Sequence, residues 1–200
     1  MFIQSGPSFD RSQKDDDALW LAYLEGQQKA LGRIFLRHYN RLYQYGIKLT
    51  GNESAVQDSI QELFLNLWEK RSKISKAHSV EFYLLYSLRR IVLRQKEQRI
   101  SIHRRNGEYI EEAPDSLQSI EERIILKEEK NERYQLFLKA QEHLTERQKE
   151  ILYLRLRHGM TNSEISTFLK ISKQRVKNCM YESIKLLKER VYHSSVERQV

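Results

Sequence analysis

The chain has 200 residues, enough for one large domain or two small domains that each bury a core. Two prolines and seven glycines are too few for the many turns of a β-sandwich or barrel, so the composition favours helices. A net charge of +8 indicates a polyanionic partner, and the single cysteine, Cys179, excludes an internal disulfide and fits a reducing cytosol. The opening residues lack the apolar segment of a signal peptide, and no apolar run is long enough to span a bilayer, so we expect a cytoplasmic protein without membrane insertion.

The charge is unevenly distributed. Residues 81–105 carry seven Lys or Arg and two acidic residues, and residues 144–190 carry eleven and five. Residues 106–143, between them, carry five basic and ten acidic residues. Two basic blocks separated by an acidic one indicate two nucleic-acid surfaces joined by a segment that avoids nucleic acid. The alternative is that both blocks are solvated helix faces.

The first structured segment, residues 15–50, is predicted to form two helices that break at Gly26. Acidic residues at 15–17 suit the positive end of a helix dipole. Apolar residues then recur at helical spacing, namely Ala30, Ile34, Phe35, Tyr39 and Leu42. Gly51-Asn52 is expected to end the second helix.

A third helix, about 53–70, is predicted to have apolar residues on two faces. At 100° per residue, its core stripe consists of Val56, Ile60, Leu63, Phe64 and Leu67. The opposite face carries Asp58, Gln61, Glu62, Leu65, Trp68 and Glu69. Leu65 and Trp68 amid acids are typical of a protein-docking face. The alternative is a central helix buried on both sides, although unpaired acids are rarely buried.

The fourth helix, about 80–99, combines an apolar core face at Leu84, Leu88, Ile91 and Val92 with aromatic and cationic residues elsewhere. The latter are Tyr83, Tyr86, Arg89, Arg90, Arg94 and Lys96, with Phe82 close by. Aromatic rings beside guanidinium groups provide the stacking and phosphate neutralisation that single-stranded DNA requires. The alternative is that the aromatic residues belong to the core and the arginines are only solvated.

A domain boundary is predicted at residues 101–118, which contain the turn signal Asn106-Gly107 and Pro114 in a polar stretch. We interpret this segment as a flexible linker within the acidic block. It divides a first domain, 15–100, from a second, 119–192, and helical periodicity resumes near Ser119 and continues to about His143. The expected fold class is therefore all-α, with two helical domains.

The strongest local pattern is a helix-turn-helix in residues 144–190. Thr145 is expected to cap a first helix and Thr161 or Asn162 a second, and Lys170-Ile171-Ser172 forms the turn before a third. Val176, Met180, Ile184 and Leu187 are expected to face inward from the third helix. Its N-terminal residues, which would enter the major groove, are Ser172, Lys173, Gln174, Arg175, Lys177 and Asn178. Lys170 occupies a turn position that is often Gly. Glycine is common there because a left-handed backbone is costly for other residues.

Both halves together resemble the small extracytoplasmic-function (ECF) sigma factors of bacterial RNA polymerase. The resemblance runs from about Asp16 to Glu189 and includes a D-x-x-Q-E-x-F-x-x-x-W run at 58–68. It implies that Asp58, Gln61, Glu62 and Trp68 bind the clamp of core polymerase, and Leu65, exposed on the same face in the helical projection, is included in this predicted surface. It further implies that residues 82–99 melt and read the −10 promoter element, that residues 144–188 read the −35 element, and that polymerase's clamp and flap regions and promoter DNA are partners.

One position departs from the family pattern, which commonly has Ala-Arg-Asn where this chain has Arg89-Arg90-Ile91. The departure leads to the hypothesis that −10 recognition is weakened or altered, with an auxiliary DNA-bound recruiter contributing to promoter choice. An anti-sigma factor is a further partner that the resemblance implies.

Three alternatives belong to other classes. The C-terminal pattern also occurs in helix-turn-helix response regulators, but residues 1–143 lack the Val/Ile-rich runs of a parallel-stranded receiver domain. An enzyme is not expected, and no metal or cofactor is predicted, because the histidines have no ligand spacing and no glycine-rich phosphate loop is present. An adaptor that binds polymerase or an anti-sigma protein without initiating transcription stays open.

Overall fold

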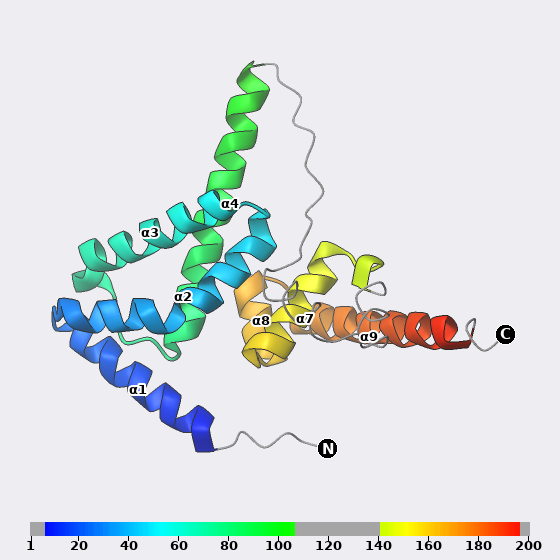
Figure 1. The fold of residues 1–200 in the computed structure, drawn as a ribbon, viewed down its shortest axis with the longest axis horizontal. Helices are drawn as coiled ribbons and strands as arrows, with labels where there is room; N and C mark the ends of the chain where they lie inside the picture. The colour runs from blue at the N-terminus through cyan, green and yellow to red at the C-terminus, as the bar shows by residue number, and fades with distance from the viewer. Residues whose placement is uncertain (1–6, 107–140, 197–200) are drawn as a thin grey trace. The chain divides into compact units, whose positions relative to one another are not determined.

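The computed structural model describes residues 7–106 and 141–196, and every regular element in these ranges is a helix (Figure 1). The chain divides into two compact units, Met1–Ile124 and Ile125–Val200. The elements of the first unit are α1 (Pro7–Leu24), α2 (Gln28–Thr50), α3 (Glu53–Lys70), the short 3-10 helix η1 (Arg71–Lys73) and α4 (Val80–Asn106). Those of the second unit are α7 (Glu146–His158), α8 (Asn162–Leu169) and α9 (Lys173–Val196). The expected all-α fold is confirmed.

The first unit is a bundle of four helices whose ends follow the turn residues of the sequence. Gly26 adopts a φ of +93° between α1 and α2, and Gly51 ends α2 with a φ of +62°. The Asn52 side chain accepts a hydrogen bond from the Ala55 amide at 2.9 Å and caps α3. The breaks expected at Gly26 and Gly51-Asn52 are therefore confirmed. The largest fully buried side chains of this unit are Trp20, Tyr23, Tyr45, Ile34, Leu42, Ile60, Leu63, Leu84, Leu85 and Leu88.

A glycine allows α2 and α3 to approach closely. Gly46 is buried within α2, and a Cβ atom at this position would lie 2.6 Å from Val56 Cγ1 on α3. Any larger residue at 46 would overlap this methyl group, so the separation of the two helices depends on the missing side chain.

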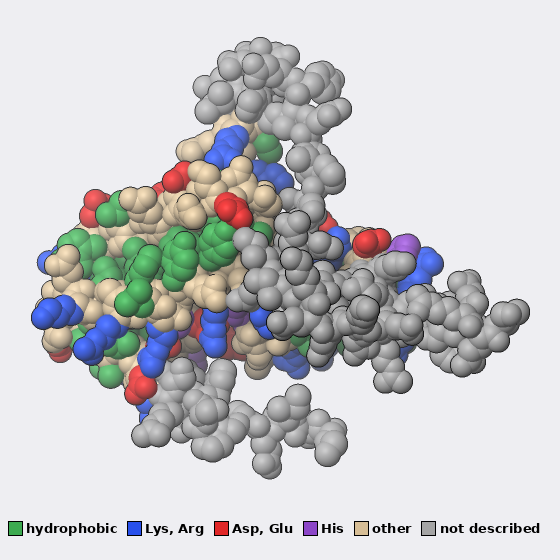
Figure 2. Space-filling model, viewed as in Figure 1, with side chains coloured by type: hydrophobic (Ala, Val, Ile, Leu, Met, Phe, Trp, Pro, Cys, Tyr) green, Lys and Arg blue, Asp and Glu red, His purple; other side chains and the backbone are tan. Residues whose placement is uncertain are grey.

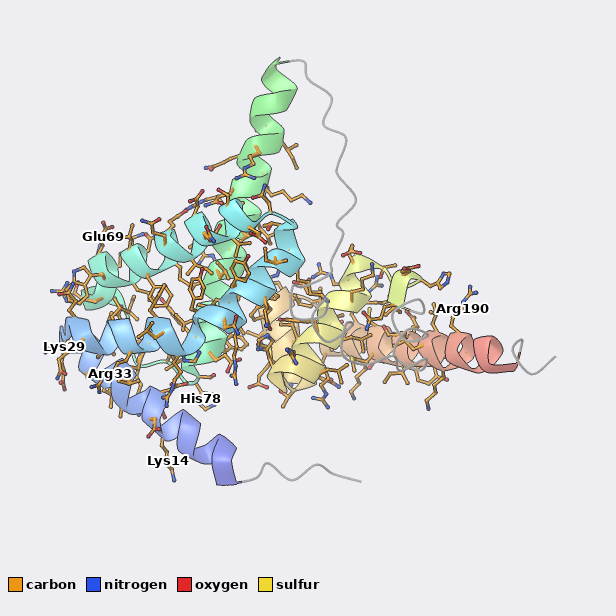
Figure 3. The ribbon with its side chains drawn as sticks, viewed as in Figure 1. Lys14, Lys29, Arg33, Glu69, His78 and Arg190 are labelled. Carbon is orange, nitrogen blue, oxygen red and sulfur yellow. The ribbon has the colours of Figure 1, made fainter. Side chains whose placement is uncertain are left out.

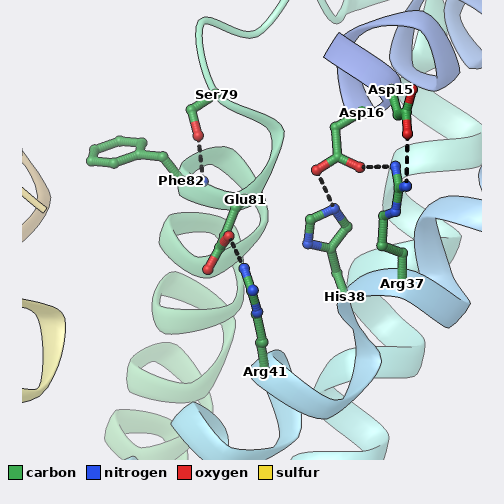
Figure 4. Close-up of polar contacts among 8 residues, drawn as sticks. All are labelled: Asp15, Asp16, Arg37, His38, Arg41, Ser79, Glu81 and Phe82. Carbon is green, nitrogen blue, oxygen red and sulfur yellow. Dashed lines mark hydrogen bonds and ion pairs between the residues drawn. The ribbon is translucent and has the colours of Figure 1, made fainter. Parts of the chain in front are cut away.

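A buried polar cluster joins α1 to α2 (Figure 4). Asp16 is 8% exposed, and its carboxylate accepts a hydrogen bond from Arg37 Nη1 at 2.7 Å. Its second oxygen lies 3.1 Å from Nε2 of the buried His38. Burial raises the pKa of Asp16, but hydrogen bonds and charge from His38 and Arg37 outweigh burial and hold the pKa below its usual range. The cluster thus keeps a carboxylate ionised at the α1–α2 contact.

Helix α4 is longer than the sequence pattern indicated. It continues through residues 101–106, the first six residues of the predicted linker. Asn106, the first residue of the turn signal Asn106-Gly107, is the last residue of α4 that the structure describes. The remainder of the predicted linker, 107–118, lies outside the described residues, as does most of the helix expected at 119–143.

The second unit contains the expected helix-turn-helix. Thr145 and Thr161 each form a capping box with the residue three positions later, Gln148 and Glu164. Lys170 ends α8 in the left-handed region with a φ of 54°.

On α9, Val176 is buried but Ile184 is 42% exposed, so the expectation that Ile184 faces inward is wrong. The buried stripe runs instead through Cys179 and Ser183. Ser183 enters the interior because its hydroxyl donates a hydrogen bond to the Cys179 carbonyl at 2.6 Å, which satisfies the polar group within the helix.

Candidate functional site

Helix α3 presents one buried and one exposed face. Val56, Ile60, Leu63 and Leu67 are at most 2% exposed. On the other side Asp58 and Gln61 are exposed and Leu65 is 56% exposed. The alternative of a helix buried on both sides is therefore wrong, and the outer face is available to a partner. Glu69 lies on the same helix, near its C-terminal end (Figure 3).

Glu62, on the border of this face, links α3 to α4. Its carboxylate accepts hydrogen bonds from Arg94 Nη2 and, at 3.1 Å, from Gln95 Nε2. Asn66 Nδ2 donates a further bond at 3.3 Å. Burial raises the pKa of Glu62, but these hydrogen bonds and the charge of Arg94 outweigh it and lower the pKa. Glu62, predicted to bind core polymerase, and Arg94, predicted to bind DNA, are thus paired with each other.

Trp68 is half-buried at the C-terminal end of the same face. The Arg71 guanidinium lies 4.7 Å from the centroid of its ring, a cation–π arrangement. Arg71 Nη1 also donates a hydrogen bond to the Trp68 carbonyl at 3.2 Å. The ring is therefore held in place while part of it stays accessible.

An aromatic band between α2 and α3 was not predicted: the sequence pattern placed Phe64 in the core stripe of the third helix and gave Phe35 and Tyr39 only as apolar residues at helical spacing. Phe35 stands 5.0 Å from Phe64 and 5.2 Å from Tyr39, and Tyr39 stacks on Tyr43 at 6.0 Å, measured between ring centroids. All four residues are half-buried, and the neighbouring Leu36 is 78% exposed. Figure 2 shows apolar side chains gathered in a band on the face formed by these helices. The sequence did contain a signal for this band, because the apolar stripe on α2 is wide.

The predicted cationic and aromatic residues of α4 differ in their exposure. Arg90, Arg94 and Lys96 are exposed, whereas Tyr83, Tyr86 and Arg89 are half-buried. Tyr86, Arg90 and Arg94 follow at intervals of four residues, so they share one face.

The aromatic residues of α4 also pack within the first unit. The Tyr83 ring meets Trp20 of α1 edge-on at 5.2 Å, and the Tyr86 ring is parallel to Phe82 at 6.3 Å. Each tyrosine is therefore partly structural. Ser79 Oγ accepts a hydrogen bond from the Phe82 amide at 3.3 Å and fixes the start of α4 (Figure 4).

Ile91 lies in the core rather than on the outward side of α4. It is 8% exposed, beside the buried Leu88 and Val92. Its burial argues against the hypothesis that the departure from Ala-Arg-Asn alters a DNA-contacting position, because a buried side chain cannot touch a strand.

The start of α9 gathers the third predicted set. Ser172, Lys173, Gln174, Arg175, Lys177 and Asn178 are all exposed. Ser172 Oγ accepts a hydrogen bond from the Arg175 amide at 3.1 Å and caps the helix. Gln174 donates to Asn178 at 2.9 Å, which pre-orients two amide side chains on one face. The arrangement has the donors and acceptors that base edges in a major groove require.

The described residues contain no group of three or more His, Cys, Asp or Glu side chains placed to hold a metal ion. None of the helices in these residues is long and apolar enough to cross a membrane.

Comparisons with known proteins agree with this layout. Residues 34–100 match the family Sigma-70 region 2, and residues 142–189 match Sigma-70, region 4. A search of curated protein sequences gives no significant match. The region 2 match occupies the half of the chain where a response regulator would need its receiver domain, so that alternative is excluded.

Two solved structures share the fold at low sequence identity. CnrH, in complex with the cytosolic domain of CnrY, has a TM-score of 0.56 and 17% identity, covering 88% of this chain and 96% of that one. The sigma factor RpoE, in complex with the anti-sigma factor NepR from Bartonella quintana, has a TM-score of 0.57 and 18% identity, covering 82% and 98%. Sigma factors act as transcription initiation factors rather than enzymes. The two matched regions and the shared two-unit fold lead to one conclusion: the chain belongs to the sigma-70 family as an ECF sigma factor, which directs core RNA polymerase to promoters.

Proposed function

We propose that this sigma factor uses three separate surfaces to bind polymerase and promoter DNA. The outer face of α3 binds core polymerase, the outward face of α4 holds the opened −10 strand, and the start of α9 reads the −35 element. Within this proposal the first domain spans 15–100 and the second 119–192.

The polymerase-binding surface consists of Asp58, Gln61, Glu62, Leu65 and Trp68. The observation that carries this assignment is Leu65, 56% exposed between hydrogen-bonding side chains. Burying an exposed leucine of this kind contributes about 1.5–3 kcal/mol to association. In the free chain the Glu62 carboxylate is occupied by Arg94, so docking through Glu62 requires that partner to be exchanged.

The −10 surface consists of Tyr83, Tyr86, Arg89, Arg90, Arg94 and Lys96. Arg90 is exposed and makes no ion pair with a described residue, so its charge is available to a phosphate. Exposed portions of the aromatic rings offer stacking platforms for unpaired bases. Strand opening is assisted because these contacts stabilise the single strand over the duplex.

The −35 surface consists of Ser172, Lys173, Gln174, Arg175, Lys177 and Asn178. Glutamine and asparagine pair well with adenine edges, and arginine and lysine with guanine or phosphate. Two small DNA footprints give high affinity only when a scaffold fixes their separation. We therefore expect promoter binding by the free chain to be poor and binding by the holoenzyme to be strong.

Catalysis belongs to the polymerase in this account, and the chain itself has no enzymatic activity and needs no cofactor. It works in the cytoplasm, where core polymerase and promoter DNA are. We also propose regulation by an anti-sigma factor, supported by the two relatives whose structures were solved in complexes of CnrH with CnrY and of RpoE with NepR.

The test is co-purification of the chain with cognate core RNA polymerase. A Gln61→Ala/Leu65→Ala variant removes one exposed amide and one exposed leucine from α3. A Gln28→Ala/Leu21→Ala variant removes the same chemistry from α2 and α1, where Leu21 is 44% exposed, and serves as the control. The α3 variant should bind polymerase at least tenfold more weakly than the control. Equal binding by both variants would contradict the assignment of α3.

A further inference from the structure

The Glu62 carboxylate lies where the polymerase-binding surface of α3 meets the −10 surface of α4. From α4 it accepts hydrogen bonds from Arg94 Nη2 and, at 3.1 Å, from Gln95 Nε2. From its own helix it accepts a hydrogen bond from Asn66 Nδ2 at 3.3 Å. The guanidinium of Arg94, which the −10 surface needs for a phosphate, is therefore bound to a carboxylate in the free chain.

Two amide side chains orient the Glu62 carboxylate independently of that guanidinium. Gln95 Oε1 accepts a hydrogen bond from Ser59 Oγ at 3.0 Å, which directs the Gln95 amino group toward Glu62. Asn66 Oδ1 accepts one from Lys70 Nζ at 2.8 Å, which does the same for the Asn66 amino group. Both amides therefore hold the carboxylate in place when its cationic partner changes.

The Glu62–Arg94 ion pair can exchange without any change in helix packing. The side chains are 31% and 54% exposed, respectively, so another group can reach either of them. Ion pairs with this exposure are weak, because water and salt screen them. Burial raises the pKa of Glu62, but the hydrogen bonds and the charge of Arg94 outweigh burial and lower the pKa. Glu62 is therefore ionised at neutral pH and keeps a cation beside it.

In the free chain Glu62 opposes DNA binding in two ways. It neutralises Arg94, and its negative charge repels phosphates that approach this part of α4. A cationic side chain of polymerase that docked on the outer face of α3 and paired with Glu62 would remove both effects. A group that binds one surface would thus raise the affinity of the other, which is a coupling between two sites.

We propose that Glu62 couples the two surfaces: it withholds Arg94 from DNA in the free chain, and a cationic side chain of core polymerase takes the place of Arg94 and releases it to the −10 strand. This inference rests on the proposed function, since it takes α3 as the polymerase-binding surface and the outward face of α4 as the −10 surface. It adds regulation to those assignments, because binding of the single strand is suppressed until polymerase is bound.

The experiment measures the affinity of the full-length chain for a fluorescent single-stranded oligonucleotide of promoter sequence, by anisotropy at low salt. Each variant is measured alone and with saturating core polymerase. The test variant is Glu62→Gln, which keeps the shape of the side chain and removes its charge. The control is Glu69→Gln, which removes the same charge from an exposed position on α3 that makes no ion pair with a described residue (Figure 3).

Without polymerase, Glu62→Gln should bind the oligonucleotide about threefold more tightly than wild type, since an exposed ion pair is worth roughly that factor. Glu69→Gln should match wild type. The gain should vanish when Arg94→Ala is combined with Glu62→Gln and compared with Arg94→Ala alone. With saturating polymerase, Glu62→Gln and wild type should bind equally, because Arg94 is released in both.

Four results would overturn the inference. They are no gain in free Glu62→Gln, an equal gain in Glu69→Gln, a gain that persists in the Arg94→Ala background, and a gain that persists in the holoenzyme. The first two leave Glu62 without a specific effect on DNA binding, the third shows that Arg94 does not carry the effect, and the fourth shows that polymerase does not exchange the pair.

Failure of the underlying −10 assignment gives a different pattern. An Arg90→Ala variant should weaken binding of the oligonucleotide by the holoenzyme. If Arg90→Ala leaves this binding unchanged while Glu62→Gln shows its gain through Arg94, the −10 surface is wrong at Arg90 and the exchange stands. If Arg90→Ala weakens binding and Glu62→Gln shows no gain, the −10 surface stands and the exchange is wrong.

Discussion

Replacement of Ile91 by asparagine, the residue common in related sigma factors, is predicted to destabilise the first domain strongly rather than improve promoter opening. Ile91 is 8% exposed on α4, so the substitution removes about 1.5–3 kcal/mol of apolar burial. An amide without a partner in the core costs a further 1–3 kcal/mol or so. The free energy of unfolding should therefore fall by about 3–5 kcal/mol, a large share of the roughly 5–15 kcal/mol typical of a domain.

The measurement is thermal unfolding followed by circular dichroism at 222 nm. A loss of this size should lower the Tm of the domain by more than about 10 °C, since 1 kcal/mol shifts Tm by roughly 4–8 °C in a domain of this size. Ile91→Val is the control and should cost only about 0.5–1.5 kcal/mol, because it keeps the β-branched shape. If Ile91→Asn keeps the wild-type Tm and raises transcription without a partner, position 91 contacts DNA and does not belong to the core.

Three further changes have defined outcomes. Asp16→Asn should lower the free energy of unfolding at neutral pH by about 2 kcal/mol, because it leaves His38 without its carboxylate and Arg37 with Asp15 alone. Since folding depresses the pKa of Asp16, its contribution is lost as pH falls, so the variant and wild type should converge in acid denaturation curves. Gly46→Ala should cost about 1–3 kcal/mol in urea unfolding, because its Cβ would overlap α3. Lys170→Gly should stabilise the second unit by up to about 1 kcal/mol by calorimetry, since the left-handed backbone costs lysine about 1–2 kcal/mol and glycine's entropy offsets roughly half of that. A change in the free energy of unfolding of the opposite sign in any of these three variants would contradict the contacts or backbone conformation described for that position.

Helix positions and caps were predictable because they depend on local chemistry. The start of α3 after Asn52 and the caps at Thr145 and Thr161 follow from side chains that satisfy the first amides of their own helices. The start of α9 at Ser172 follows for the same reason. These residues need no distant partner, so the sequence alone contains the required information.

Features that depend on neighbouring helices were not predictable. The half-exposure of Phe35 and Tyr39 depends on how far α3 covers α2, and periodicity within one helix does not report that. The Glu62–Arg94 pair joins residues that were assigned to separate surfaces, because charge patterns along the sequence do not reveal contacts between helices. The length of α4 was underestimated because a polar helix that projects from its bundle lacks the apolar periodicity used to recognise it.

The aromatic band on α2 and α3 lies outside the residue set that sequence reasoning assigned to α3. The half-buried rings of Phe35 and Phe64 and the 78% exposed Leu36 leave apolar area accessible on these two helices. Aromatic residues of this kind often dominate the affinity of protein interfaces.

The most direct test of the central claim is run-off transcription by cognate core polymerase on genomic DNA fragments, with and without this chain. The account predicts discrete transcripts that appear only with the chain and disappear with a Gln174→Ala/Arg175→Ala variant, whose side chains lie at the exposed start of α9. A folded chain that binds core polymerase and yields no specific transcript would contradict the claim that it is a promoter-recognition subunit.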